Sequence, residues 1–545
     1  MIECTNIPAS TFSMTSYTGQ WTSLEAAHLL RRTTFGPTQQ QIDDIVAMGM
    51  DAAVEAIVQM TAFPDPVVFH PDENIATFGA SWHNEFLPDD ETLRDETKSA
   101  RKWSMQAWIG RRINNEQLAS PTITEKMCQF WHNHFAVNKT GDDRITYSYF
   151  KTLEANALGN FKTMVEQITI DPCMMLFLDT AWNTKWAPNE NYARELLELY
   201  TVGKGEHLGG GDYSNYTEED ILEGAKILTG WKVRENNSST AHPYSEFDTD
   251  HHEQSDKHLS HHFNNAVLSN NEDQEYLDFI NLIFQNDQCA YHLVTKFYRY
   301  FVSTEVTQDI ENQVIEHLAQ LFIANNYDIR PVIVELLKSE HFYDNVNIGA
   351  NIKSPLEFLF SVVNPMMAMP AIGTEGDHVI WRQFYQKASG WDQSWLYPPS
   401  VAGWPAYYQQ PAYNQHWLNA STIDSRFWFI TQMTTHNTGI STDPFGTEHI
   451  FKPDSLAFLD QLDTPSDGIA VIDQLAGLFF SRPLDQSRKD MLLNTLTDGL
   501  PAFEWTIQYG EYIANQSDPT FSDPVKDVFE KTLSQLFMLP EFQCC

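Results

Sequence analysis

Signals for the start of a helix recur along this chain more than any other local pattern. A Ser, Thr, Asp or Asn precedes an apolar-periodic run, with a carboxylate or amide three residues later or with Pro at the first helical position. Helix starts of this kind are expected at Thr22, Thr38, Ser120, Thr217 and Asp523. Runs that alternate between apolar and polar residues are few. We therefore predict an all-α fold with long irregular loops and at most a small β-hairpin.

Three long stretches interrupt the helical pattern. Residues 61–90 are rich in Pro, Asn and Asp, residues 236–265 are polar and histidine-rich, and residues 397–413 combine Pro, Tyr and Gly. Loops of this length in a compact protein are commonly functional or disordered. No internal repeat is evident. We predict a main helical domain over residues 1–442 and a C-terminal helical segment over residues 443–545 that packs on it.

The charge of the chain restricts its partners. Among 545 residues, 42% are hydrophobic, which is enough for a sizeable core, while the formal net charge is −39. Such a negative field repels phosphate backbones and anionic membranes, so we expect no nucleic-acid partner. The plainer interpretation of this acidic composition is solubility, and the sharper one is cation binding.

Targeting and redox signals are weak. No apolar run reaches about 18 residues, so we expect no transmembrane helix. Residues 1–20 lack a basic segment followed by an apolar one, so no secretory signal is visible. The six cysteines are scattered without a C-x-x-C pair, which fits neither a zinc framework nor a disulfide scaffold.

The first candidate site lies in the predicted helix from Pro121 to His134. His132 and His134 project roughly 200° apart on a regular helix, so they cannot chelate one metal together. Each could act as a general base or a hydrogen-bond donor. The alternative for His134 is a buried histidine with its hydrogen bonds satisfied. Asn133, between them, is a candidate substrate-binding residue.

The second candidate is the segment from Pro188 to Tyr200. At 100° per residue, one arc of this helix is apolar and the other is polar. The polar arc contains Glu190, Asn191, Arg194, Glu195 and Glu198. One interpretation is a solvated face with a Glu190–Arg194 ion pair. The other is a cleft wall, where carboxylates around an arginine have divergent pKa values and supply an acid and a base, or hold a hard cation.

Two loops supply further candidates. The histidine-rich stretch has the nitrogen and oxygen ligands for a divalent metal, with His251, His252 and Glu253 as candidates, although its spacing matches no closed zinc motif. The alternative is a mobile polar loop. In the aromatic loop, Trp404 suits stacking on a sugar ring or on a partner surface, or packing as a plug. Arg426 follows further on as another substrate-binding candidate. Nucleotide-binding glycine loops and the serine-hydrolase elbow are missing from the sequence.

Several of these segments together resemble the bacterial domain-of-unknown-function 1800 family (DUF1800). The resemblance extends over nearly the whole chain, in family order. It is carried by Leu29–Thr38, Phe130–Val137, Pro188–Gly203, Leu228–Trp231, Lys353–Glu357, Pro398–Pro405 and Leu539–Gln543. In one place the chain departs from the family pattern of His-Asp with Lys four residues after the Asp. Here His252-Glu253 precedes Lys257, and the longer side chain of Glu changes the reach of the carboxylate.

The resemblance implies a location and a neighbour rather than a reaction. Many family members carry export signals, and many are encoded beside a DUF1501-type protein, which resembles sulfatases and alkaline phosphatases. This implies work outside the cytoplasm, at the periplasm or cell surface, on acidic or sulfated polysaccharide. It is an association and gives no mechanism.

Two hypotheses follow for the function. In the first, the protein is an enzyme that cleaves a glycan by hydrolysis or elimination. His132, with His134, would be the base or acid, Glu195 and Glu198 its acidic partners beside Glu190, and Arg194 would bind an anionic group. His252 and Lys257 would close the site, Asn191 and Trp231 would contact substrate, and a divalent metal is possible. In the second, the protein is a non-catalytic surface or assembly partner of the DUF1501-type protein.

Overall fold

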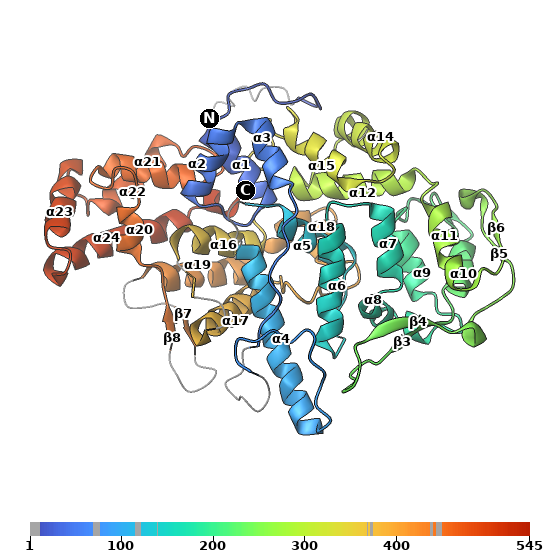
Figure 1. Ribbon diagram of the computed structural model, residues 1–545. Coiled ribbons are helices and arrows are strands. Elements are labelled where there is room, and N and C mark those ends of the chain that lie inside the picture. The colour runs from blue at the N-terminus through green and yellow to red at the C-terminus, as the bar shows by residue number, and fades with distance from the viewer. Residues whose placement is uncertain are drawn as a thin grey trace.

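A computed structural model describes residues 11–68, 77–114, 121–138, 140–367, 369–370, 374–435, 440–442 and 449–545. The described chain is predominantly helical, as predicted, and the molecule is elongated (Figure 1). Up to residue 301 it contains helices α1 (Ser23–Thr33), α2 (Gln39–Met48), α3 (Met50–Ile57), α4 (Glu91–Asn114), α5 (Thr124–His134), α6 (Asp143–Asn156), α7 (Phe161–Thr169), α8 (Pro172–Phe177), α9 (Asn191–Glu195), α10 (Glu218–Ile227), α11 (Glu275–Ile283) and α12 (Gln288–Phe301).

The second half of the chain adds further helices, and short helical turns occur throughout. The helices are α13 (Gln308–Ile310), α14 (Glu316–Ala324), α15 (Ile329–Lys338), α16 (Pro355–Met366), α17 (Glu375–Gly390), α18 (Pro405–Tyr408), α19 (Ala420–Thr434), α20 (Ser455–Asp460), α21 (Gly468–Phe479), α22 (Gln486–Leu496), α23 (Ala502–Ala514) and α24 (Pro519–Phe537). The short turns are η1 (Thr180–Trp182), η2 (Leu196–Tyr200), η3 (Thr249–His251), η4 (His261–Phe263), η5 (Glu272–Gln274), η6 (Glu311–Ile315), η7 (Tyr413–Trp417) and η8 (Pro540–Gln543).

The strands of the described chain form only separate antiparallel pairs of two. They are β1 (His207–Gly209) with β2 (Asp212–Tyr213), β3 (Trp231–Arg234) with β4 (Tyr244–Phe247), β5 (Lys257–His258) with β6 (Val267–Leu268), and β7 (Ile440–Thr442) with β8 (His449–Phe451). Among the described residues, these pairs do not join into a larger sheet. They are small additions to a helical protein, which agrees with the predicted fold class.

The predicted helix starts agree with the structure where the signal is a complete capping box. Thr22, Thr38 and Thr217 each cap a helix with the reciprocal hydrogen bonds of that motif. In each case the hydroxyl accepts from a backbone amide that has no intrahelical acceptor in the first turn. The side chain three residues later accepts the backbone amide hydrogen of the capping residue.

Two predicted starts based on Pro are wrong. The helix expected from Pro121 begins at Thr124, and Ser120 lies outside the described residues. The helix expected from Asp523-Pro524 begins at Pro519, with Asp518 as its N-cap, and Pro524 lies inside it. Pro121 lies three residues before the first residue of α5, and Pro524 is the sixth residue of α24, where its missing N–H removes one intrahelical hydrogen bond. The Pro at the first helical position of α24 is Pro519 instead.

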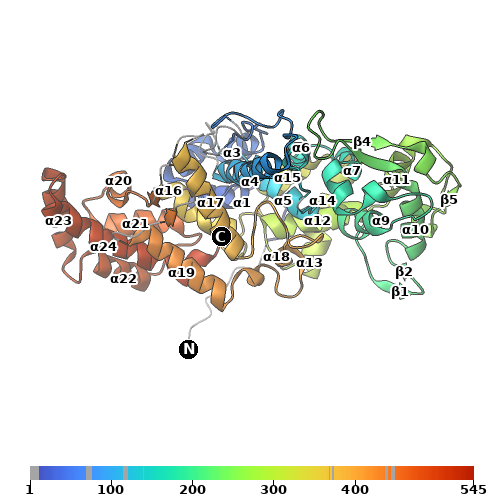
Figure 2. The same cartoon turned by 90° about the horizontal axis from the view of Figure 1, so that it is seen from below.

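One continuous apolar core connects the ends of the molecule. Figure 2 shows helices α20–α24 at one end and α9–α11 at the other, with α1, α4, α5 and α16 between them. Buried side chains of a single cluster extend from Ala26 to Phe542. The chain end is fixed to the middle of the molecule, where the amide of Lys353 donates to the carbonyl of Gln543 at 2.7 Å.

The predicted boundary between residues 442 and 443 falls inside the β7–β8 hairpin, and it stays a prediction. Within the described ranges, none of the helices combines the length and the apolar character needed to cross a bilayer.

Candidate functional site

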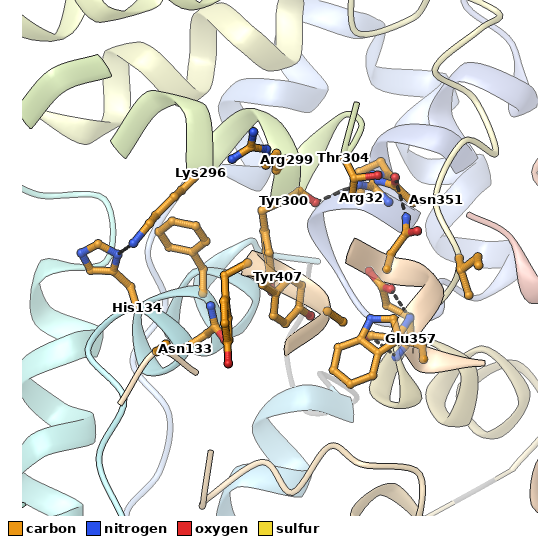
Figure 3. A pocket seen from close by; sticks show the side chains of 18 residues that line it. Arg32, Asn133, His134, Lys296, Arg299, Tyr300, Thr304, Asn351, Glu357 and Tyr407 are labelled. Carbon is orange, nitrogen blue, oxygen red and sulfur yellow. Dashed lines mark hydrogen bonds between the residues drawn. The ribbon is translucent and has the colours of Figure 1, made fainter. Parts of the chain in front are cut away.

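A pocket of about 60 Å³ lies where α5, α12 and α16 meet the segment that contains α18 and η7. Segments from five distant parts of the sequence form its wall (Figure 3). The lining consists of Arg32, Phe130, Asn133, His134, Lys296, Arg299, Tyr300, Thr304, Asn351, Ile352, Ser354, Glu357, Ala402, Ala406, Tyr407, Tyr408, Asn414 and Trp417. Arg32, Phe130 and Trp417 are buried, whereas Tyr408 is 43% exposed, so one side of the pocket opens to solvent.

Three cationic side chains line this pocket. Arg32 donates to the carbonyl oxygens of Tyr300 at 2.7 Å and of Phe301 at 2.8 Å, and its third contact is the Sγ of Cys545. Arg299 lies over the ring of Tyr413, and its Nε has no partner in the described structure. Lys296 also donates to a carbonyl, that of Leu199, at 2.7 Å. Within the described residues, none of the three cations forms an ion pair with a carboxylate.

The single carboxylate in the lining is already neutralised. Glu357 forms a salt bridge with the buried Lys126 and completes a capping box with Ser354 at the start of α16. Burial alone would raise the pKa of Glu357, but Lys126 and Arg32 lower it to about 2. The pocket therefore keeps an excess of positive charge, in a chain whose formal net charge is −39.

Lys296 and His134 form a hydrogen-bonded pair at one end of the pocket, and Arg32 lies toward the other (Figure 3). Nε2 of His134 lies 3.0 Å from the carbonyl oxygen of Tyr200, so this nitrogen carries the proton. Nδ1 of His134 then accepts from Nζ of Lys296 at 3.1 Å. Burial, reinforced by Lys296, holds the pKa of His134 well below its usual range, in agreement with a neutral ring.

The environment also changes the acidity of Lys296. Burial, followed by the nearby charge of Arg299, lowers the pKa of Lys296 from 10.5 to about 7. A neutral amine has two N–H bonds and one lone pair. Two acceptors, His134 Nδ1 and the Leu199 carbonyl, match the two N–H bonds, which leaves the lone pair available as a base.

The aromatic loop forms part of the pocket wall through one close backbone contact. The Oδ1 of Asn133 accepts the amide hydrogen of Trp404 at 2.9 Å. Gly403, with φ of +84°, passes so near that a Cβ there would lie 2.2 Å from Asn133 Oδ1. Only glycine fits both the left-handed backbone and the contact. Asn133 therefore positions the loop whose following turn carries Tyr407.

Comparison with protein families identifies the chain. A family model described as "Protein of unknown function (DUF1800)" matches residues 28–544. The chain belongs to the DUF1800 family. Comparisons with curated proteins and with solved structures found no match.

The segments that carry the resemblance to DUF1800 converge on the pocket. Four of them line it, since Arg32, Asn133, Glu357 and Ala402 each come from a different one. A fifth, Pro188–Gly203, supplies the carbonyl oxygens that accept from His134 and Lys296. Segments far apart in the DUF1800 sequence therefore share one location in the fold.

Among the sequence-predicted site residues, His134 and Asn133 are at the pocket, whereas His132 faces the opposite side of α5. The ring of His132 packs between Phe150 and Trp404, and burial lowers its pKa to about 3. Its Nδ1 lies 3.4 Å from the hydroxyl of Tyr149. The expected opposition of the two histidines on α5 is thus observed, with His134 at the pocket.

Two further candidates are fixed by contacts of their own. Trp404 is buried, and its indole does not reach the pocket lining. Arg426 is also buried, where it donates to the side chain of Gln543 at 3.0 Å and to the carbonyl of Lys353 at 3.2 Å.

The polar arc at residues 190–198 forms a separate surface cluster. Arg194 forms ion pairs with Glu190, as the spacing predicted, and with Glu218, both at 2.9 Å. Glu198 pairs with Lys204 at 2.7 Å. Glu195 has a different environment, since burial and then the charge of Glu198 raise its pKa to about 7. The described contacts of these residues include none with His132 or His252.

His252 and Lys257 belong to a third, buried cluster. Both contact the carboxylate of Glu275, at 2.8 Å and 2.6 Å, and all three side chains are 0% exposed. The carboxylate of Glu253 instead accepts the amide of Ser255 at 3.0 Å. The ring of His251 pairs with Asp248 at 2.9 Å. The three metal candidates His251, His252 and Glu253 therefore have different partners and are not gathered around one point.

Asn191 and Trp231 are also distant from the pocket lining. Asn191 is exposed beside Asp179, and Trp231 is buried against Phe247 and Tyr276. The residues that sequence reasoning missed are Arg32, Lys296 and Arg299. A usable signal exists for the last two, because they lie three residues apart in α12, a helix whose other neighbours are largely apolar and buried.

Proposed function

We propose that this pocket binds the anionic group of an acidic carbohydrate and that the protein cleaves acidic or sulfated polysaccharide by elimination. One observation supports this most directly. Arg32, Lys296 and Arg299 line one pocket without a carboxylate partner among the described residues. A cation withdrawn from water without a counter-ion is costly, so an anionic ligand is the natural complement.

The remaining lining favours a carbohydrate over a bare anion. Tyr300, Tyr407 and Trp417 form a chain of aromatic contacts, with ring centroids 5.4 Å and 5.6 Å apart. Asn351 and Asn414 add amide groups to the lining, and Asn414 donates to the Oδ1 of Asn351 at 3.0 Å. Aromatic faces with a few placed polar groups are typical of sites for small polar ligands. A cavity of about 60 Å³ suits one charged substituent and part of a sugar ring, with the rest of the chain outside.

Elimination fits the ionisable groups better than hydrolysis. In this reaction a base removes the proton next to a uronic-acid carboxylate, the bond to the glycosidic oxygen breaks, and a carbon–carbon double bond forms. The departing oxygen takes a proton from solvent or a hydroxyl. Lys296, with a pKa of about 7, is a suitable base, and Arg32 or Arg299 would stabilise charge on the carboxylate.

Hydrolysis by the usual route needs two carboxylates on opposite sides of the glycosidic bond. The described lining supplies one, Glu357, which is held ionised by Lys126. The implied location outside the cytoplasm and a DUF1501-type partner belong to the same proposal, since both would place the protein near acidic polysaccharide.

The test is turnover of a panel of uronic-acid and sulfated polysaccharides by the wild type and by Lys296→Met. Ultraviolet absorbance of the new double bond and the number of reducing ends are followed together. We expect absorbance to increase with at least one substrate and to fall by about 10²- to 10⁴-fold in Lys296→Met. The control is Lys531→Met, because Lys531 is an exposed lysine paired with Asp527 on α24.

Three other results are informative. Reducing ends without absorbance would replace elimination by hydrolysis. Binding of acidic oligosaccharides without turnover would support the alternative, a non-catalytic surface or assembly partner. Absence of binding to every acidic glycan, with Arg299→Gln behaving as the wild type, would refute the proposal.

A further inference from the structure

A second site lies at the far end of the molecule from α20–α24, next to the β1–β2 hairpin. Asp212, His261 and His262 each place one ligand atom so that the three atoms lie within 4.8 Å of one another. In the ranges that the structure describes, no other three His, Cys, Asp or Glu side chains bring their ligand atoms together in this way. We propose that these residues bind a divalent transition metal ion such as Zn²⁺.

The ligand set suits that class of ion. Two imidazoles and a carboxylate are typical ligands of zinc and its neighbours, whereas calcium and magnesium prefer oxygen alone. Ligand atoms bound tetrahedrally to zinc at about 2.0–2.1 Å lie about 3.3 Å apart. Nε2 of His262 already lies 3.0 Å from Oδ1 of Asp212. Small side-chain rotations of His261 would complete the set and leave a fourth position for water.

The two histidine rings lie side by side, and the ring of His262 already contacts the carboxylate of Asp212. Their ring centroids lie 4.0 Å apart with the planes tilted by 38°, on the short turn η4. His261 is exposed, and its ring takes part in none of the hydrogen bonds of the described residues, whereas its backbone carbonyl accepts from the amide of Asn264. The side chains of His262 and Asp212 are 13% and 36% exposed. An ion can therefore reach the site from solvent, although the side chains of His262 and Asp212 are partly buried.

One buried carboxylate holds both ligand-bearing segments in place. Asp220, in the first turn of α10, is 0% exposed. Its carboxylate accepts from the backbone and hydroxyl of Ser260, both at 2.7 Å, and Ser260 directly precedes His261. The same carboxylate accepts from the backbone and hydroxyl of Thr217, both at 2.8 Å.

The backbone of Thr217 in turn forms an isolated antiparallel β-bridge with that of Asp212. The hairpin and the histidine turn are thus fixed to one helix end, independently of any metal. Groups that orient metal ligands in this way usually affect affinity strongly.

This inference is independent of the proposed function, because Asp212, His261 and His262 are not in the lining of the pocket. The test is calorimetric titration of the full, chelator-treated chain with ZnCl₂. We expect one equivalent to bind, and His261→Gln and Asp212→Asn each to weaken binding by about tenfold or more. Asp220→Asn should weaken it by about 10- to 100-fold while the chain stays folded by circular dichroism.

The matched control is His258→Gln. His258 is exposed on β5 in the same histidine-rich segment, but it is outside the cluster. It should bind Zn²⁺ as the wild type does. The proposal is overturned if the wild type binds no zinc, or if His261→Gln and Asp212→Asn bind it with unchanged affinity. Because His261 is exposed, its replacement leaves the fold intact, so a loss of binding in that variant reports on coordination.

Discussion

The Nζ atom of Lys296 lies 3.1 Å from Nδ1 of His134, whose other nitrogen donates to the carbonyl of Tyr200. This chain of hydrogen bonds joins α12, α5 and the end of the Pro188–Gly203 segment. It fixes the tautomer of the histidine, and it leaves a lysine of lowered pKa at the edge of a cationic pocket. Four predictions follow from this and from the clusters around it.

The first concerns pH. Burial lowers the pKa of Lys296 to about 7, so its neutral form increases as the pH rises through 7. Turnover by a neutral lysine base should therefore increase over this range, measured as kcat/KM. Affinity for inorganic sulfate should decrease over the same range, because the pocket loses a positive charge. Lys296→Arg should still bind sulfate, but its kcat/KM should no longer increase as the pH rises through 7. An identical pH profile in that variant would exclude Lys296 as the base.

The second concerns Arg32. Arg32→Met removes the donors for the carbonyls of Tyr300 and Phe301 and leaves both oxygens buried. We expect the free energy of unfolding to decrease by about 3 kcal/mol, measured by urea denaturation. The control is Arg330→Met, because Arg330 pairs with Glu55 on the surface and should contribute below about 1 kcal/mol. Equal midpoints for the two variants would contradict the structural role of Arg32.

The third separates structure from catalysis at His252 and Lys257. Glu275→Gln leaves Lys257 charged and unpaired in a fully buried site. Loss of one partner of a buried ion pair costs about 3–5 kcal/mol. The variant should unfold at much lower urea concentration, while sulfate binding at the pocket is retained under conditions where it is folded. A variant of normal stability without turnover would instead support the catalytic interpretation of His252 and Lys257.

The fourth concerns Glu195, whose pKa is raised to about 7 by burial and then by Glu198. Below its ordinary pKa of 4.5, Glu195 is protonated whether the chain is folded or unfolded. As the pH rises further, the unfolded state ionises first, so the folded state loses stability until the pH passes 7.

Glu195→Gln should therefore raise the free energy of unfolding at about pH 8, by on the order of 2 kcal/mol, and leave it unchanged at about pH 4. Urea denaturation at both pH values measures this. In a Glu198→Gln background the gain from Glu195→Gln at about pH 8 should be smaller, because the charge of Glu198 contributes to the raised pKa of Glu195. Equal effects of Glu195→Gln on the free energy of unfolding at both pH values would contradict the raised pKa.

Equal turnover by wild type and Glu195→Gln would remove Glu195 from the mechanism.

The candidate site was predicted only in part. The sequence predicts the base or acid at His132, with His134, and a substrate-binding residue at Asn133, and of these three the pocket lining contains His134 and Asn133. Sequence reasoning assigned them partners on the polar arc near Arg194, whereas the described contacts of His134 are with Lys296 and the backbone of Tyr200. The segment formed by α9 and η2 does meet α5, but through the apolar side, where the ring of Tyr200 lies against His134. A helical wheel gives the faces of each helix separately and does not say which faces meet.

The metal candidates illustrate the same limit. The density of histidines in residues 236–265 predicted a possible metal site, yet the neighbouring pair His251 and His252 has partners of its own. The geometric cluster combines His261 and His262 with Asp212, which lies outside that loop. The sequence separation between residues 212 and 261 is bridged only because Asp220 ties both segments to α10.

What the sequence alone determined is local. Capping boxes at Thr22, Thr38 and Thr217 and the helical class depend on residues within a few positions of each other, and the kinship with DUF1800 depends on short motifs in a fixed order over residues 28–544. The tertiary structure decided which buried charges are left without a counter-ion. Their neighbours in sequence do not show that Arg32 and Arg299 lack an ion-pair partner. Packing buries Arg32 and partly buries Arg299 at one pocket, where they contact carbonyl oxygens and an aromatic ring, while Glu357, the one carboxylate of the described lining, forms its salt bridge with Lys126.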